Sequence, residues 1–426
     1  MIKFLLQGLL RDKSRSHLPI MVVAVGVMLS VFMHAYITGI MNDTIEMNAA
    51  FSYGHVKVLT KGYADNMSQF PNDMALDNTD VLVANLKKQL PNIEWVERIQ
   101  FGGLIDVPND KGETVAQGPV IGIGIDLFGN ETNETKRLRI HESMVEGRMP
   151  SKPSEILVSN DFAKKLGIQM GNTVTLMAST MYGGMAYQNF VVVGTVSFGV
   201  QVLDRGTIIA DIQDVRDALD MDNASGEILG FFSQGYYSDK EADKAKSIFY
   251  AQQDNVSIQD EFTPILLTFR EQGDMGTFVD LSHSMGAIIT FVFIIAMSIV
   301  LWNAGLLGGI RRYGEFGVRL AMGETKHHVF ASLLYESFFV GIIGSIIGTA
   351  FGLLFAWLLQ EYGLDMSDEM KGSSMMMPTV LKARITMADY YIGFIPVIFS
   401  TLLGAALAGI GIYKRKTSQL FKELEA

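Results

Sequence analysis

Four long apolar runs stand out against an otherwise mixed pattern of hydrophobic and polar residues. Each holds few charged residues, and they cover residues 19–41, 285–309, 329–360 and 390–413. A helix needs about 20 apolar residues to cross roughly 30 Å of hydrocarbon, and a backbone in lipid must satisfy its own hydrogen bonds. The pattern therefore predicts four transmembrane helices. The stretches between them cover residues 42–284, 310–328 and 361–389.

Basic residues cluster in the short segments beside these runs. They precede the first run, separate the second from the third and follow the fourth, in residues 1–18, 310–328 and 414–426. Short basic loops tend to remain in the cytoplasm. Both termini and residues 310–328 are therefore predicted to be cytoplasmic, which leaves residues 42–284 and 361–389 outside.

The residues before the first run carry a pattern of their own. Apolar residues recur at helical spacing in "IKFLLQGLLR", so residues 1–18 are predicted to form a helix on the inner membrane surface. The alternative is the frayed start of the first span. The first run is too long for a typical signal-peptide core, and no A-x-A-like site follows Met41. We therefore expect a retained anchor.

Residues 42–284 alternate between strand-like and helix-like stretches. Strands are predicted at "FGGLIDVPND", "VAQGPVIGIGID", "EILVS" and "FVVVGTV". Helices are predicted at "DIQDVRDALD", "DKEADKAKSIFYAQQ" and "NDFAKKLG", the last capped by Asn160 or Asp161 and closed by Gly167. The expected fold class is an α-helical membrane protein with four transmembrane helices plus a large extracytoplasmic α+β domain inserted between helices 1 and 2.

Composition narrows the class of protein. The chain has 426 residues, of which 49% are hydrophobic and 19% charged, and its mean hydropathy is +0.24. A chain with this composition is too apolar for an ordinary soluble protein. The net charge of −11, with its acidic excess in residues 42–284, argues against a nucleic-acid partner. Cysteine is absent, so no disulfide contributes to stability.

Catalytic and nucleotide-binding motifs are missing from the sequence. No segment fits G-x-x-x-x-G-K-[ST], the nucleophile elbow or H-E-x-x-H. We therefore expect a chain that is no enzyme, binds no cofactor and holds no metal. The methionines of "SSMMMP" have no His or Cys beside them, which makes metal binding the weaker interpretation of that run.

A charged, glycine-rich segment, "RRYGEFGVRLAMGE", lies between the second and third runs. Glu315, Arg319 and Lys326 are predicted to lie on a short cytoplasmic helix. The same helix would carry the apolar residues Phe316, Val318, Leu320 and Met322. Such a mixed surface could dock in a groove of a partner, and the segment's glycines permit close packing and a sharp exit. The alternative is a solvated loop that only sets topology.

The predicted spans also hold candidate site residues. Glu336 is an acid inside the third span, which indicates either a functional site or a structural pairing with a nearby arginine. His34 lies in the outer half of the first span, where packing in a helix interface is favoured over substrate contact. Flexible methionines suit surfaces that accept varied apolar ligands. The candidate substrate-facing residues are Met28, Phe32, Met33, His34 and Met41.

Small residues recur every three or four positions in the last two spans. They are Gly341, Gly344, Gly348 and Gly352, followed by Gly404, Ala408 and Gly411. Rows of this kind let helix backbones approach closely. They predict tight helix packing and no binding site.

Two parts of the sequence resemble known membrane permeases. "RRYGEFGVRLAMGETKHHVFASLLYESFFVGIIGSIIGTAFGLLFAWLL" resembles the core of the FtsX-like permease family, with its basic residue, E-[IF]-G, R-x-A-x-G and later glutamate. The matching residues are Arg311, Glu315, Phe316, Gly317, Arg319, Ala321, Gly323 and Glu336. "VEGRMPSKPSEILVSNDFAKKLGIQMGNTVTL", followed by "FVVVGTV", is similar to the periplasmic domain shared by macrolide-exporter and lipoprotein-releasing permeases. "GHVKVLTKGYA" resembles the lipoprotein-releasing branch more closely.

This resemblance implies the permease subunit of an ABC transporter in the bacterial inner membrane, with its large domain in the periplasm. A separate ATP-binding subunit would hold ATP and Mg and grip a coupling helix. The coupling residues would be Arg311, Glu315, Phe316, Gly317, Arg319, Ala321, Met322 and Gly323. Four spans are few for a transporter, so a second copy or a related permease is expected as a dimer partner.

The resemblance leaves the substrate open. A lipoprotein released from the inner membrane is favoured, with a periplasmic carrier as a further partner. Efflux of peptides or amphipathic drugs is an alternative. A signalling permease that regulates a periplasmic partner is the other, although such members carry a smaller external domain.

Overall fold

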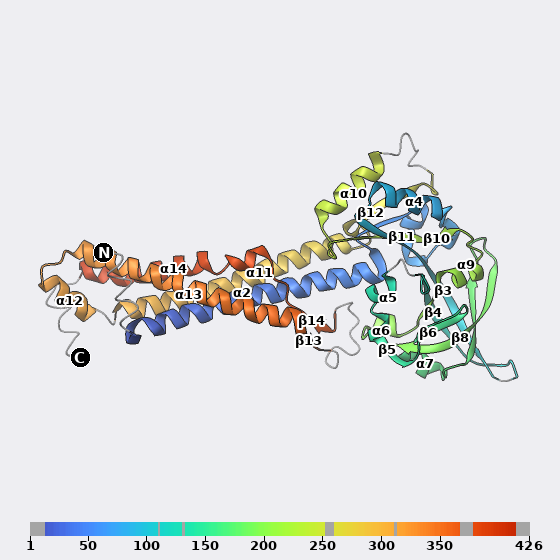
Figure 1. The fold of residues 1–426 in the computed structure, drawn as a ribbon, viewed down its shortest axis with the longest axis horizontal. Helices are drawn as coiled ribbons and strands as arrows, with labels where there is room; N and C mark the ends of the chain where they lie inside the picture. Colours follow the sequence, from blue (N-terminus) through green and yellow to red (C-terminus); the bar gives the residue numbers. More distant parts are fainter. Residues whose placement is uncertain are drawn as a thin grey trace. The chain divides into compact units, whose positions relative to one another are not determined.

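The computed structural model describes residues 13–109, 111–129, 133–251, 260–310, 313–366 and 378–414 (Figure 1). Within these residues, four helices are long and apolar enough to cross a membrane. They are α2 (Lys13–Asn48), α11 (Met275–Ile310), α13 (Lys326–Tyr362) and α14 (Phe394–Lys414). Each overlaps one of the four predicted apolar runs.

The chain divides into two compact units. The helical unit comprises residues 1–41, 281–365 and 380–426. The sheet unit comprises residues 42–280 and 366–379. The helical unit therefore contains most of the four long helices, and the sheet unit contains the long insert predicted between the first two of them.

Helix α2 extends beyond the predicted first span at both ends. It already includes Lys13, so residues 13–18 continue the long helix and form no separate surface helix; residues 1–12 lie outside the described part of the chain. At the other end the polar stretch after Met41 stays helical as far as Asn48. A π-helix, Ala49–Tyr53, and Gly54 at φ 64° then end it.

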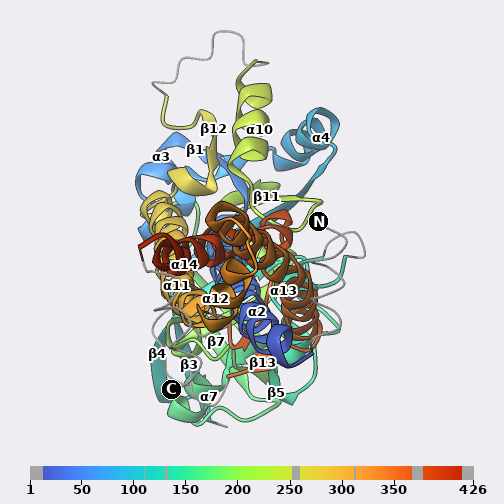
Figure 2. The same ribbon diagram turned by 90° about the vertical axis from the view of Figure 1, so that its left-hand side faces the viewer.

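Glycines bring α13 into close contact with α2 in the helical unit, whose long helices Figure 2 shows nearly end-on. A Cβ atom on Gly344 would lie 2.4 Å from Val23, and one on Gly348 would lie 2.4 Å from the backbone oxygen of Ala24. Gly404 of α14 lies equally close to the backbone of α11, because its Cβ would be 2.6 Å from the carbonyl oxygen of Trp302. The predicted tight packing at these three glycines is confirmed.

One lobe of the sheet unit is an antiparallel sheet with two helices. Its strand order is β12 (Pro264–Thr268), β1 (Val56–Thr60), β11 (Glu227–Phe232) and the first half of β3 (Ile93–Pro108). Helices α4 (Thr79–Gln89) and α10 (Asp239–Ala251) accompany it (Figure 1). The helices bury Leu86 and Phe249 in a core shared with Val58, Trp95 and Leu266.

The second lobe is built on the other half of β3. Its further strands are β4 (Thr114–Ile125), β9 (Thr207–Asp211), β6 (Glu155–Ser159), β8 (Met185–Val196), β7 (Thr173–Ser179) and β5 (Met144–Gly147). Because β7 pairs with both β8 and β3, the pairings of β3, β4, β9, β6, β8 and β7 close into a cycle. Helices α7 (Asn160–Leu166) and α9 (Ile212–Leu219) add Phe162 and Val215 to the core.

Short elements complete the described chain. Those of the sheet unit are α3 (Lys61–Asp65), η2 (Met67–Gln69), η3 (Asn72–Met74), β2 (Leu76–Asp77), α5 (Glu134–Arg137), α6 (Ile140–Ser143), α8 (Gln201–Asp204), β10 (Ala224–Ser225) and η4 (Phe269–Glu271). Those of the helical unit are α12 (Tyr313–Ala321), β13 (Leu364–Asp365), β14 (Val380–Leu381) and η5 (Met387–Tyr390).

The local predictions for the insert agree with these elements, with one correction. Each of the four predicted strands lies within or across β3, β4, β6 and β8, and the three predicted helices are α7, α9 and α10. Gly167 closes α7 with φ 69°, as expected. The N-cap of α7 is Ser159, so the predicted cap at Asn160 or Asp161 is wrong by one residue. Both predicted capping residues already have helical backbone geometry and lie inside the helix.

Candidate functional site

The charged segment between α11 and α13 folds into helix α12, which is anchored on its neighbours by its apolar side. The Tyr313 hydroxyl donates to the carbonyl oxygen of Ala408 in α14 at 2.7 Å. Phe316 is 1% exposed and packs in a cluster with Val329 and Leu333 of α13. The helix is therefore held against two long helices. Arg311, predicted to belong to the same segment, lies outside the described residues.

This anchoring corrects two expectations about the docking surface. Phe316 faces the bundle, so its ring is not available to a partner. Helix α12 ends at Ala321, and Lys326 is the first residue of α13 instead of a member of the short helix. Its Nζ donates to the carbonyl oxygen of Tyr413 at 3.2 Å, at the end of α14. The surface that α12 can offer is therefore smaller than the sequence predicts.

An exposed stripe remains on α12 and the turn that follows it. Val318, Ala321 and Met322 are exposed, and Met322 is 75% exposed. Their spacing places them on one side of the helix, away from Phe316. Gly323 follows at φ 96°, a conformation that favours glycine, and turns the chain toward α13. Glu315 lies half-buried beside this stripe.

Arg319 is committed to a contact within the chain. Its Nε and Nη2 donate to the two carboxylate oxygens of Glu324 at 2.5 and 2.8 Å, and its Nη1 donates to the Ser332 hydroxyl at 3.0 Å. These hydrogen bonds from Arg319 hold the pKa of Glu324 below its usual range. The contact fixes the turn between α12 and α13. Sequence reasoning missed Glu324, although its charge five residues after Arg319 was visible.

The candidate substrate-facing residues of α2 are all half-buried. They are Met28, Phe32, Met33, His34 and Met41. The Phe32 ring stacks on that of Tyr36 with a centroid distance of 6.3 Å. Phe32 also packs beside the buried Ala35 and Ala356. Their contact with a substrate stays a prediction, as does a functional role for the half-buried Glu336.

His34 pairs with an acid far away in the sequence. Its Nδ1 lies 2.7 Å from Oδ1 of Asp389, whose side chain is fully buried. The other oxygen of Asp389 accepts from the backbone nitrogen and hydroxyl of Thr386, at 2.6 and 2.8 Å. This position agrees with the interface role favoured for His34. Asp389 was missed, although the T-x-x-D spacing at residues 386–389 is a visible capping signal.

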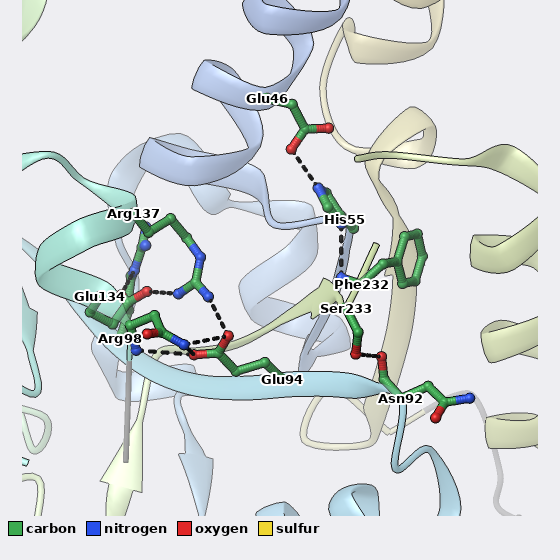
Figure 3. Close-up of polar contacts among 10 residues, drawn as sticks. Glu46, His55, Asn92, Glu94, Arg98, Glu134, Arg137, Phe232 and Ser233 are labelled. Atoms are coloured by element: carbon green, nitrogen blue, oxygen red, sulfur yellow. Dashed lines mark hydrogen bonds and ion pairs between the residues drawn. The ribbon is translucent and has the colours of Figure 1, made fainter. Parts of the chain in front are cut away.

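The sheet unit holds a second polar cluster, beside a cavity of about 270 Å³ (Figure 3). On one side Glu46 Oε2 lies 2.8 Å from the ring of His55. On the other, Arg137 donates to Glu94 at 2.8 Å, and its guanidinium lies 3.7 Å from the centre of the Phe231 ring. Partial burial acts to raise the pKa of Glu94, but the positive charge of Arg137 and hydrogen bonds from Asn133 and Arg137 hold it below its usual range. None of these pairings was predicted.

Metal ligation is not indicated within the described residues. No group of three or more His, Cys, Asp or Glu side chains there could hold a metal ion. The charged clusters of this part of the chain instead pair arginine, lysine or histidine with carboxylates, whose geometry serves hydrogen bonding.

Comparison with known proteins gives matches to two families. The model of the MacB-like periplasmic core domain matches residues 18–243, which is more than half of the chain. The model of the FtsX-like permease C-terminal region matches residues 287–417 and includes α12.

Curated relatives of the chain are similar at low identity. A lipoprotein-releasing system transmembrane protein LolC from Haemophilus influenzae is 19% identical over 68% of this chain and 69% of the relative. A protein of the same name from Xylella fastidiosa is 21% identical over 54% of each chain. Among solved structures, the periplasmic region of MacB from Actinobacillus actinomycetemcomitans matches with 14% identity and a TM-score of 0.32, over 50% of this chain and 87% of that one.

Proposed function

Since the chain belongs to the family of ABC transporter permeases with a MacB-like periplasmic core domain and an FtsX-like permease region, we propose that it releases lipoproteins from a bacterial inner membrane. The members of this family are permease subunits that are not themselves catalytic. ATP and Mg would be bound and hydrolysed by a separate ATP-binding subunit. The chain would convert the closure of that subunit into movement of its own helices.

The main support for this proposal is the way in which α12 packs against α13 and α14. Tyr313 and Phe316 fix the helix to α13 and α14, while Val318, Ala321 and Met322 remain exposed. A helix that is anchored on one side and exposed on the other can pass a push from a partner to the long helices. The bidentate contact of Arg319 with Glu324 stiffens the turn through which that push would travel. We infer that this exposed stripe is where the ATP-binding subunit docks.

Lipoprotein as the substrate rests on two supports. The relatives from Haemophilus influenzae and Xylella fastidiosa are both named as parts of a lipoprotein-releasing system. The half-buried face of α2 around Met28 and Phe32 offers flexible and aromatic side chains, which suit an acyl chain of variable shape.

The proposed setting follows from charge and exposure. The basic segments support a cytoplasmic position for both termini and α12, and a periplasmic position for the sheet unit. Of the residues in its most apolar stretch, 6% are buried in α11, against 39% in α2 and in α13. Such a helix has surface left for lipid and for a second permease, so a dimer, homodimeric or with a related permease, is part of the proposal. A periplasmic carrier would accept the released lipoprotein.

The test is reconstitution of the full chain with its ATP-binding subunit in proteoliposomes that contain a lipidated lipoprotein. Val318→Asp with Met322→Asp should lower co-purification of the ATP-binding subunit at least about tenfold, because charge is introduced into an apolar docking face. Tyr362→Asp is the matched control, since Tyr362 is 78% exposed at the opposite end of α13. It should leave association and ATP hydrolysis unchanged.

Two readouts separate the parts of this proposal. The proposal is supported in both parts if the α12 variant loses association with the ATP-binding subunit and the unmodified chain releases lipoprotein in an ATP-dependent way. Association without lipoprotein release would point instead to efflux of a peptide or drug, or to signalling. Unchanged association in the α12 variant would show that the exposed stripe is no docking site.

A further inference from the structure

His55 lies where α2 gives way to the sheet, and both of its ring nitrogens have partners (Figure 3). The backbone nitrogen of Phe232 lies 2.9 Å from Nδ1, and Oε2 of Glu46 lies 2.8 Å from Nε2. A backbone N–H can only donate, so Nδ1 must accept and carries no proton. Nε2 then donates its proton to the carboxylate. This arrangement therefore requires a neutral imidazole.

The present position of the His55 ring does not accommodate a protonated imidazole. The side chain is 1% exposed, and a proton on Nδ1 would point at the N–H of Phe232, which is also a donor. The backbone of His55 is held as well, because its N–H donates to Gly230 and its carbonyl accepts from Phe269. The ring, and not the strand, is the part that can move.

The cavity beside the ring offers a place to which it can move. His55 lines this cavity of about 270 Å³ together with Glu46, Glu94 and Arg137. The side chains of Glu46 and Glu94 are 24% and 31% exposed, so water reaches the cavity. Two carboxylates against one guanidinium favour an added cation. Arg137 is already engaged by Glu94 and by the fully buried Glu134.

The other neighbours of the ring add no opposing charge in contact with it. The rings of Phe231, Phe232 and Tyr237 lie 4.9 to 6.2 Å from the imidazole, between centroids. Burial raises the pKa of Tyr237 well above its usual value, so this phenol stays neutral. Beyond it, Arg270 pairs with Asp239 at 3.2 Å. Glu46 is thus the charged group in direct contact with His55.

We propose that protonation turns the His55 imidazole away from Phe232 and into the cavity, between Glu46 and Glu94. The move releases the N–H of Phe232 and so loosens the connection between the end of α2 and strand β11. The π-helix Ala49–Tyr53 and Gly54, which precede His55, can rewind to follow it. We call this connection between the end of α2 and β11 the joint. It is closed when His55 is neutral, so proton uptake accompanies its opening and acid favours the open form.

The consequence for transport rests on the proposed function. The joint lies directly after the first membrane helix, so opening it would weaken the transmission of movement from α2 to the sheet unit. Acid outside the membrane would then reduce lipoprotein release for each ATP hydrolysed, while the docking of the ATP-binding subunit on α12 would be unaffected.

A buried tryptophan makes the opening measurable in the full chain. Trp95 is 3% exposed and pairs with Gly230 of β11. The chain has three tryptophans, so replacing Trp302 and Trp357 with Phe leaves Trp95 as the single emitter. In nanodiscs, between about pH 8 and pH 5, its emission should change reversibly. His55→Asn should abolish the change, because Asn supplies an acceptor for Phe232 but does not titrate.

Two further variants test the cause of the change. Glu46→Gln should move the midpoint to lower pH, because the carboxylate that favours the imidazolium is lost. His141→Asn is the matched control: His141 is an exposed histidine of the same unit, and its loss should leave the titration as it is. If His55→Asn fails to fold, ¹⁵N NMR of the histidine-labelled chain decides, since Nδ1 of His55 must be unprotonated at neutral pH.

The outcomes distinguish this inference from the proposed function. Three outcomes would each overturn this proposal. They are an emission change that persists in His55→Asn, a midpoint unmoved by Glu46→Gln, and a protonated Nδ1. The emission measurement needs no ATP-binding subunit. If that subunit failed to dock on α12, the proposed function would be contradicted, but the titration would be unaffected.

Discussion

In the sheet unit, buried charges join elements that are far apart in the sequence, whereas in the helical unit glycines bring helix backbones into contact. Lys57 and Glu227 pair at 2.8 Å with side chains that are 2% and 4% exposed. Gly348 of α13, by contrast, leaves no room for a Cβ beside the carbonyl oxygen of Ala24. The first unit tolerates buried charge because each charge has its partner. At such glycines the second leaves no room even for a methyl group.

The difference reflects the solvent of each unit. In water, burial of apolar side chains drives folding, and its gain can offset the desolvation of a few paired charges. In lipid, apolar side chains gain little by leaving the hydrocarbon, so close packing and polar contacts hold helices together. We therefore expect the sheet unit to be destabilised by removal of a charged partner, and the helical unit by addition of a larger side chain.

The largest effect is expected from Lys57→Met in the sheet unit. It leaves the buried carboxylate of Glu227 without its cation, which should lower the free energy of unfolding by about 3 to 5 kcal/mol. The measurement is chemical denaturation in detergent of the full chain with Trp302 and Trp357 replaced by Phe, followed by Trp95 emission. The double variant Lys57→Met with Glu227→Leu should regain most of the loss. A double variant as unstable as the single one would contradict this account of the pair.

The next effect tests the glycine contact of the helical unit. Gly348→Val would push a side chain into the backbone of α2 and should lower stability by about 2 kcal/mol. Ala350→Val on the same helix is the control, because Ala350 is exposed. Thermal unfolding in detergent should show the loss in the first variant alone. Equal melting temperatures would mean that α2 and α13 can separate without cost.

A smaller effect is expected at Glu155, whose carboxylate lies in strand β6. Hydrogen bonds from Arg148 lower its pKa to about 2. A lowered pKa contributes stability above the usual carboxyl range and loses it as the pH falls toward about 2. Glu155→Gln should therefore cost about 1 to 2 kcal/mol at neutral pH, by loss of a charged hydrogen-bonded pair. The gap between the two proteins should close on acidification; a constant gap would rule out this role for the charge.

The smallest effect concerns the polar contact of the helical unit, His34 with Asp389. Asp389 lies in η5 and not in a long helix, but polar pairs between membrane helices, which contribute about 1 kcal/mol or less, give the scale. A cycle of His34→Asn, Asp389→Asn and the double variant should give a coupling energy of that size from detergent unfolding. Thr386→Val is the comparison, since it removes a hydrogen bond to Asp389 but leaves His34 in place. A coupling energy of zero would make the contact incidental.

Local pattern predicted most of the elements, because each depends on neighbours in the sequence. The apolar runs were long enough to mark the four helices, and the apolar residues of "EILVS" marked the strand at residues 155–159, all five of which are buried. The first span was predicted to end at Met41, and α2 continues beyond it, because the polar residues up to Asn48 stay helical outside the apolar run. Apolarity marks contact with lipid, and a helix can continue beyond it.

The site was harder to predict because it depends on contacts between distant residues. Nothing near His34 in the sequence points to Asp389, and His55 meets Phe232 only through the pairing of β1 with β11. Phe316 was assigned to a docking surface because α12 has apolar residues on more than one side. Only the positions of α13 and α14 decide that Phe316 is the buried one.

The pairing of β1 with β12 has a consequence for how such a chain could arise. β1 is the first strand of the sheet unit and β12 the last, and they lie side by side from Val56–Thr268 to Thr60–Pro264. The first and last strands within residues 42–280 are thus neighbours. A domain of this kind can be inserted into the loop between two membrane helices, or exchanged for another, without redirecting either helix. One set of membrane helices could in this way acquire different inserted domains.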